Sequence, residues 1–89
     1  MKTIWKFPLP GLADEIIITM PIGAQVLHFE HQAGAELPSI WALVESENAN
    51  EYRKYYIVGT GHPVPDGLTH LGTCQHGPFV WHLFEAVKP

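Results

Sequence analysis

The chain has 89 residues, and we expect a single domain over residues 1–89. Nine acidic and five basic residues give a formal charge of −4, which argues against direct binding to a nucleic-acid polymer, because such binding needs several lysines and arginines at phosphates. A single cysteine excludes an intrachain disulfide, and no apolar run approaches the ~20 residues of a membrane-spanning helix, so we expect a cytoplasmic protein that makes no membrane contact.

Apolar and polar residues alternate with a period of two along most of the chain, which is the pattern of half-buried β-strands. Residues 2–9 predict the first strand, and Pro8 places its end at a sheet edge, because proline cannot donate to a β-ladder. Strands are also predicted at 14–20 and 24–32, on either side of the turn 21–23. We expect these two strands to form a first hairpin.

The middle of the chain predicts a central strand. Strand 24–32 alternates regularly, with Leu27 and Phe29 on the same face, and residues 33–38 follow as a connecting loop. Residues 39–45 are apolar on both faces, which is typical of a central strand that is covered on both sides.

The second half of the chain predicts two more hairpins. A polar turn at 46–50 precedes strand 51–58, and we expect that strand to pair with 39–45. Strands 68–75 and 79–87 are predicted to form the third hairpin. With no convincing amphipathic helix, the sequence predicts an all-β fold, a small antiparallel sandwich or a partly open barrel of about six to seven strands.

The three tryptophans are many for a chain of this length. Trp5, Trp41 and Trp81 each lie in an apolar run, so we expect them in the core, with stacking at a ligand or an interface as the alternative. A domain of this size is marginally stable by itself, because a small chain buries a smaller share of its surface. We therefore expect a homo-oligomer.

The loop over residues 59–67 is the most unusual stretch, with three of the eight glycines and two of the eight prolines. Gly59, Thr60 and Gly61 let the backbone approach a ligand and form a nest of amide donors for an anion, and Thr60 and His62 add side-chain donors. The two prolines hold the loop in one shape, which suits recognition. The alternative is purely structural, with glycines that end a strand and prolines that stiffen a crossover.

No residue pattern demands an enzyme, and we expect no catalytic residues. Cys74 and a histidine form a formal nucleophile–base pair, but Cys74 lies in a predicted strand and away from the groups that activate a thiol. Six histidines invite a metal, yet neither Cys-x-x-Cys nor His-Glu-x-x-His occurs, so we expect no metal site and no cofactor. His70 and His82 remain open as a two-histidine pair, because they could lie on neighbouring strands of the third hairpin.

Five stretches resemble a family of short proteins that are encoded by phages and prophages and have no established activity. These stretches are Trp5-Lys6-Phe7-Pro8-Leu9, Met20-Pro21-Ile22-Gly23-Ala24, Trp41-Ala42-Leu43-Val44, Gly59-Thr60-Gly61-His62-Pro63 and Phe79-Val80-Trp81-His82-Leu83-Phe84-Glu85. The similarity extends from Lys2 to Glu85. It implies a stand-alone domain in the cytoplasm of an infected host, and it supplies no catalytic residues to transfer.

We therefore expect a small non-enzymatic binding protein that sequesters a small anionic ligand, such as a signalling nucleotide, and so antagonises host defence. The expected ligand-binding residues are those of the loop and two on the preceding strand: Gly59, Thr60, Gly61, His62, Arg53 and Tyr55. Arg53 or Lys54 would supply charge, and Tyr55, Tyr56 or a tryptophan would stack on a base. One alternative is an interaction or structural protein that blocks a host protein, and another is a small enzyme that uses a histidine or Cys74.

Overall fold

The computed structural model describes residues 1–86, and these residues form seven strands and no helix. The strands are β1 (Lys2–Pro8), β2 (Glu15–Pro21), β3 (Gln25–Glu30), β4 (Ser39–Glu45), β5 (Asn50–Gly59), β6 (Leu68–His76) and β7 (Phe79–Ala86). The predicted last residue of the final strand, Val87, lies outside the described residues. The all-β prediction is confirmed, and the period-two pattern located every strand.

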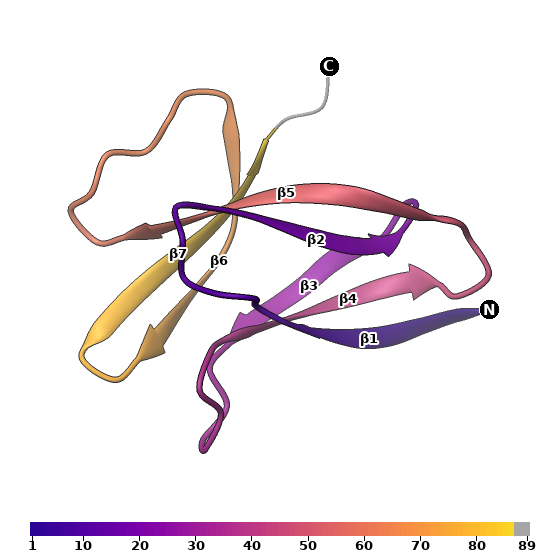
Figure 1. Cartoon of the computed structure of the whole chain (residues 1–89), viewed down its shortest axis with the longest axis horizontal. Helices are drawn as coiled ribbons and strands as arrows, with labels where there is room; N and C mark the ends of the chain where they lie inside the picture. The colour runs from indigo at the N-terminus through magenta and orange to yellow at the C-terminus, as the bar shows by residue number, and fades with distance from the viewer. Residues whose placement is uncertain (87–89) are drawn as a thin grey trace.

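The strands form two antiparallel sheets that do not close into a barrel (Figure 1). One sheet has three strands in the order β1-β4-β3, and the other has four in the order β2-β5-β7-β6. The contact between the sheets is most extensive where β3 lies against β6. The architecture is therefore the sandwich, and not the partly open barrel.

Two predicted strand positions are confirmed. β1 is an edge strand and ends at Pro8, as expected of a residue that cannot donate to a ladder. β4 is the central strand of its sheet, with Ile40, Ala42 and Val44 buried on one face. Its other face is only half covered, as the half-buried Trp41 shows. Among the described residues, no third layer of strands packs against this face.

Two of the three predicted hairpins are wrong. β2 pairs with β5 and not with β3, and β3 pairs with β4. β4 and β5 lie in different sheets, so strands 39–45 and 51–58 do not form a hairpin. The residues 33–38, which were expected only to connect hairpins, instead form the loop of the β3–β4 hairpin. The third prediction, the β6–β7 hairpin, is confirmed.

The two wrong hairpins have a common cause, since both turns carry the chain from one sheet to the other at the same end of the sandwich. The backbone N–H of Ile22 donates to the carbonyl oxygen of Ala49 at 2.8 Å, and the Asn48 side chain donates to the carbonyl of Ile22 at 2.9 Å. The two turns thus satisfy each other's backbone groups, as a hairpin would within its own ladder. A short turn reverses the direction of the chain, but it does not determine which sheet the next strand joins.

The core lies between the sheets and draws on the strands of both and on the loops beside them. Its buried residues are Leu9, Ile16, Ile18, Met20, Ala24, Phe29, Ile40, Ala42, Val44, Tyr55, Ile57, Cys74 and Leu83. The expected shared face of Leu27 and Phe29 is wrong, because β3 has a bulge between Val26 and His28. The bulge shifts the alternation, so Val26 and Phe29 face the core while Leu27 is 47% exposed.

The tryptophans are less buried than expected. Trp5 is 40% exposed, because β1 is an edge strand that the four-stranded sheet does not cover extensively. Trp41 is half-buried on the outer face of its sheet, where the Lys6 ammonium lies 5.8 Å from its ring centroid. Trp81 packs against the core from the side and is also half-buried. None of the three is a fully buried core residue.

Candidate functional site

The loop between β5 and β6 arcs out from the strands (Figure 1) and begins with a tight turn. The N–H of His62 donates to the carbonyl oxygen of Gly59 at 3.0 Å, and Gly61 has a φ of +89°. This is the arrangement of a type II turn, which favours glycine at its third position. The N–H of Thr60 also donates to the carbonyl oxygen of Val80 on β7 at 3.3 Å. These bonds give the start of the loop a defined shape.

Gly59 lies where a larger residue would have to displace its neighbours. A Cβ atom at this position would lie 3.1 Å from Nδ1 of His62 and 3.3 Å from Cζ3 of Trp81. The imidazole and indole rings therefore pack directly against the bare backbone of the glycine. This glycine has a structural role, because the absence of a side chain leaves space for the His62 ring at the end of β5.

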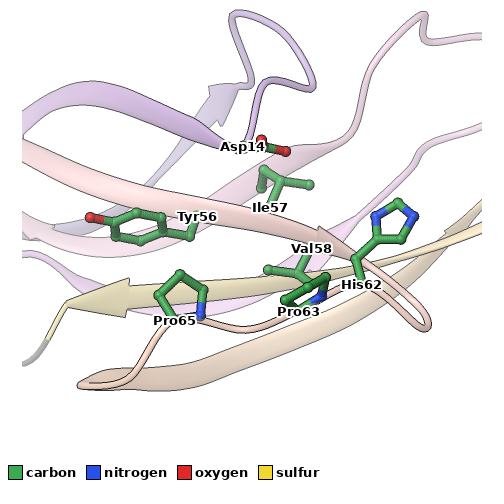
Figure 2. Close-up of a pocket in the computed structure, with 7 residues that line it drawn as sticks. All are labelled: Asp14, Tyr56, Ile57, Val58, His62, Pro63 and Pro65. Carbon is green, nitrogen blue, oxygen red and sulfur yellow. The ribbon is translucent and has the colours of Figure 1, made fainter.

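A pocket of about 320 Å³ lies beside the loop (Figure 2). The loop supplies His62 and two prolines, and β5 supplies three consecutive residues near its C-terminal end. The complete lining is Asp14, Tyr56, Ile57, Val58, His62, Pro63 and Pro65. Asp14 is held there because its carbonyl oxygen accepts a hydrogen bond from the N–H of Ile57 at 3.1 Å. The volume is at the lower end of the roughly 300–1,000 Å³ of small-molecule pockets.

The electrostatics of this pocket differ from the expectation for an anion site. Its lining brings one carboxylate, that of Asp14, and neither a lysine nor an arginine. A negative group in a partly enclosed pocket repels phosphate, whereas a carboxylate accepts hydrogen bonds from N–H donors. The pocket therefore favours a neutral or positively charged ligand that presents N–H groups and apolar surface.

A second hollow of about 350 Å³ also has His62 in its lining. Gly59, Thr60, His62, Pro78, Phe79, Val80 and Trp81 line it. Phe79 is 57% exposed, and its ring centroid lies 5.6 Å from that of Trp81. The indole N–H of Trp81 is buried and has no hydrogen-bond partner within the described part of the chain. The hollow thus presents an open aromatic pair next to the loop.

A row of hydrogen-bonded side chains runs from the loop across the surface of β7 and β6. Oγ1 of Thr60 lies 2.9 Å from Nε2 of His82, and Nδ1 of His82 lies 3.0 Å from Oγ1 of Thr73. The same Thr73 oxygen lies 2.9 Å from Nε2 of His70. One proton assignment satisfies the whole row when both rings are neutral: His70 donates to Thr73, Thr73 donates to His82, and His82 donates to Thr60.

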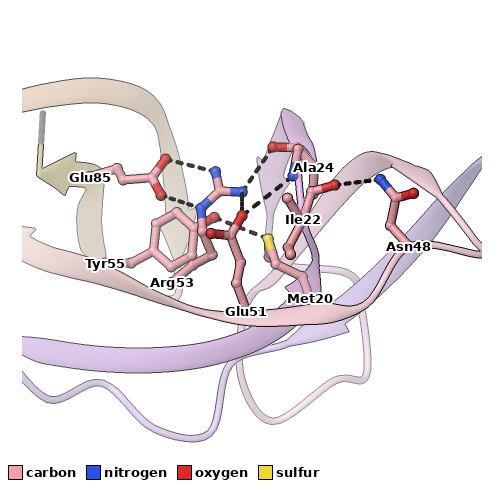
Figure 3. Close-up of polar contacts among 9 residues, drawn as sticks. Met20, Ile22, Ala24, Asn48, Glu51, Arg53, Tyr55 and Glu85 are labelled. Carbon is pink, nitrogen blue, oxygen red and sulfur yellow. Dashed lines mark hydrogen bonds and ion pairs between the residues drawn. The ribbon is translucent and has the colours of Figure 1, made fainter. Parts of the chain in front are cut away.

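Arg53, which was expected to bind the ligand, is 8% exposed and is held by neighbours within the protein (Figure 3). Its Nε and Nη2 donate to the two carboxylate oxygens of Glu85 at 2.6 and 3.0 Å, and its Nη1 donates to the carbonyl oxygen of Ala24 at 3.0 Å. The Glu51 carboxylate lies 3.5 Å away. The bond to Glu85 raises the pKa of Arg53, although burial opposes this rise. The guanidinium therefore ties the β2–β3 turn to the four-stranded sheet.

Tyr55 and Lys54 are likewise occupied away from the loop. The Tyr55 side chain is fully buried, its hydroxyl contacts Sδ of Met20 at 3.3 Å, and burial raises its pKa. Lys54 pairs with Glu15 at 3.3 Å on the exposed surface. The structure thus gathers Gly59, Thr60, Gly61 and His62 at one place and puts Arg53 and Tyr55 in the interior of the sheet.

Sequence reasoning did not identify Asp14 and Val58 as lining residues, and it missed Thr73 as the link between two histidines. Asp14 reaches the pocket only through the pairing of β2 with β5, which the predicted hairpins excluded. In strand 51–58, the period-two alternation puts Val58 on the same face as Tyr56, and this pattern was the available signal. The position of Thr73 opposite His82 follows from the register of the confirmed β6–β7 hairpin.

Cys74 has the properties of a structural thiol. It is buried, and burial together with the nearby Glu30 raises its pKa, so the thiolate is disfavoured. Within residues 1–86, no group of three or more histidine, cysteine, aspartate or glutamate side chains is arranged to hold a metal ion. The same residues contain no helix that is long and apolar enough to cross a membrane.

Comparison with known proteins gives a family and no closer relative. No curated protein and no solved structure matches the chain. The model of a family described as a domain of unknown function (DUF7352) matches residues 1–89. The match agrees with a resemblance to an uncharacterised family of short proteins, and it carries no statement about phage origin. This chain, an antiparallel β-sandwich with a shaped loop between β5 and β6, belongs to the DUF7352 family of unknown function.

Proposed function

We propose that the protein is a non-enzymatic binding protein that captures a small ligand with a planar ring in the pocket beside the β5–β6 loop. The observation that carries this proposal is the pocket of about 320 Å³ between Tyr56 and the two loop prolines. The turn at Gly59–His62 fixes one wall of this pocket before any ligand arrives. A wall that is already ordered reduces the entropy lost on binding.

The chemistry of the lining defines the ligand class. Tyr56 and the prolines offer flat apolar surfaces for a ring, and Asp14 offers an acceptor for ring N–H groups. A nucleobase has both features. The signalling nucleotide that we expect from the sequence would thus be recognised through its base, because no lysine or arginine lines the pocket to hold its phosphate.

The setting of this proposal is a phage-encoded protein in the cytoplasm of its host, where binding removes a signalling molecule from host defence. The support for this setting is the resemblance of the sequence to short phage and prophage proteins. A homo-oligomer belongs to the same proposal, because a domain of 89 residues gains stability from burying further surface. Light scattering on the purified chain tests the oligomer, and a monomer at all accessible concentrations would remove it.

The ligand proposal is tested by thermal unfolding with a panel of nucleosides and of linear and cyclic nucleotides. A ligand at about 100 times its Kd stabilises the folded state by ~2.7 kcal/mol, which for a domain of this size raises Tm by on the order of 10 °C. Tyr56→Ala should abolish the shift. Tyr52→Ala is the matched control, since Tyr52 lies on the same strand, is 82% exposed and does not line the pocket. Absence of a shift across the panel at high ligand concentration would end the proposal.

A protein partner is the second candidate, and the open Phe79–Trp81 pair favours it. Phe79 is exposed and Trp81 is half-buried beside it, and aromatic side chains at the edge of a hollow are typical anchors of protein interfaces. Capture of one host protein by the wild-type chain, with loss of that capture in Phe79→Ala, would support this function. Equal capture by the variant would argue against this surface. A nucleotide-dependent rise in Tm that Phe79→Ala retains would favour the pocket instead.

A further inference from the structure

The row of side chains across β7 and β6 contains a geometry that the proposed ligand pocket does not use. Nε2 of His70 and Nδ1 of His82 approach the same atom, Oγ1 of Thr73, at 2.9 and 3.0 Å. The two ring centroids are 6.3 Å apart and the ring planes are inclined by 49°. Two imidazole nitrogens from neighbouring strands thus converge on one point at the surface. The geometry points to a transition-metal site between His70 and His82.

Metal binding requires an adjustment of three side chains. Metal–nitrogen bonds to histidine are about 2.0–2.1 Å, so an ion that takes the place of the Thr73 hydroxyl oxygen requires each nitrogen to move roughly 0.9 Å closer to that point. His70 and Thr73 are exposed and His82 is half-buried, so solvent reaches the position between the two rings. The Thr73 hydroxyl turns aside, because its oxygen occupies the point at which the two nitrogens converge. Water completes the coordination of a divalent ion such as Ni²⁺, Cu²⁺ or Zn²⁺, which all accept imidazole.

Both rings are already oriented by contacts outside the metal position. Nε2 of His82 lies 2.9 Å from Oγ1 of Thr60, so a metal on Nδ1 leaves Nε2–H to donate to that hydroxyl. A histidine ligand typically donates its other N–H in this way, which fixes its tautomer and ring direction. The His70 ring packs edge-on against Phe84, with centroids 5.3 Å apart. The loop residue Thr60 thereby becomes part of the support of the site.

The other histidine pair of the protein lacks this convergence. The rings of His31 and His76 are closer, at 4.2 Å between centroids, but Nε2 of His31 bonds the carbonyl oxygen of Ala35 at 2.6 Å. Nδ1 of His76 is buried and has no hydrogen-bond partner within residues 1–86. No atom is shared between these two rings in the way that Thr73 is shared, so His31 and His76 serve as a comparison pair.

The position of the site has a consequence for ligand binding. Val58, which lines the pocket, is the register partner of His82 on the adjacent strand. A divalent ion on His82 would bring positive charge next to a pocket whose lining has neither lysine nor arginine. This consequence rests on the proposed function, because it concerns the phosphate of a bound nucleotide. Metal binding itself does not rest on it.

Titration of the full chain with NiCl₂, without an affinity tag and without any nucleotide, tests the site by calorimetry. We expect one Ni²⁺ per chain, and a loss of affinity of about tenfold or more for His70→Gln and for His82→Gln. His28→Gln and His76→Gln are matched controls and should bind as the wild type does. Circular dichroism verifies that each variant remains folded. No binding with metal in large excess, or equal binding by the His70 and His82 variants, would overturn the proposal.

A second measurement locates the ion independently of any substitution. Bound Ni²⁺ is paramagnetic and broadens the amide resonances near it, so in a ¹H–¹⁵N spectrum we expect broadening centred on His70, Thr73 and His82. Broadening centred on His31 and His76 would refute the assignment. Because neither experiment contains a nucleotide, failure of the metal site leaves the ligand-pocket proposal untouched, and failure of the nucleotide panel leaves the metal site untouched.

Discussion

The substitution Arg53→Met tests how much a single buried side chain contributes to this sandwich. Arg53 gives two hydrogen bonds to Glu85 and one to the carbonyl of Ala24, all at 2.6 to 3.0 Å (Figure 3). Methionine fills most of the same space but donates no hydrogen bond. The variant therefore leaves the Glu85 carboxylate, whose side chain is 17% exposed, without its counter-charge and leaves the Ala24 carbonyl without this donor.

Removing one member of a buried ion pair typically costs about 3–5 kcal/mol, because the other charge stays desolvated and unpaired. A domain of this length has a total unfolding free energy of roughly 4–13 kcal/mol, so we expect Arg53→Met to remove about a quarter of it or more. Urea unfolding followed by circular dichroism at neutral pH measures the difference. The double variant Arg53→Met/Glu85→Met should recover much of the loss, since it removes the stranded carboxylate as well.

Lys54→Met is the matched control for this prediction. Lys54 is the next residue on the same strand, and its ion pair with Glu15 is about half exposed on both sides. Such exposed pairs contribute about 0.2–1 kcal/mol, so the control variant should unfold at nearly the wild-type urea concentration. If Arg53→Met costs no more than Lys54→Met, the buried network does not stabilise the fold and our reasoning about it is wrong.

Two further predictions concern packing and the cysteine. A Cβ at Gly72 would lie 3.1 Å from Cβ of Phe29, so Gly72→Ala should destabilise the sandwich by about 1–3 kcal/mol in thermal unfolding. Gly11→Ala should have little effect, because the space around Gly11 is open. Equal Tm values for the two variants would contradict this prediction. Because burial raises the pKa of Cys74, its thiolate is less populated than that of a free cysteine at any given pH, and native protein at pH 8 should react with a disulfide reagent far more slowly than protein in urea. A rapid native reaction would show that the thiol is accessible.

The sequence alone contained the information for the seven strands and for part of the candidate site. Period-two alternation and the proline and glycine turns located each strand, because a half-buried strand must place apolar residues on one face regardless of its neighbours. The cluster Gly59, Thr60, Gly61 and His62 lies at one place for a similarly local reason, since it forms a single turn. The β6–β7 pairing was also local, because its turn stays within one sheet.

Tertiary structure decided which strands pair and where the charged groups go. The turns before β3 and before β5 could each connect strands of one sheet or strands of different sheets. Which connection forms depends on hydrogen bonds between the two turns, at Ile22, Asn48 and Ala49. The resulting pairing of β2 with β5 places Asp14 next to β5 and in the lining of the pocket. It also enclosed Arg53 between Glu85 and Ala24. Period-two alternation identifies which face of a strand is buried, but it does not identify the residues that pack against that face. These contacts between distant residues therefore appear only in the folded molecule.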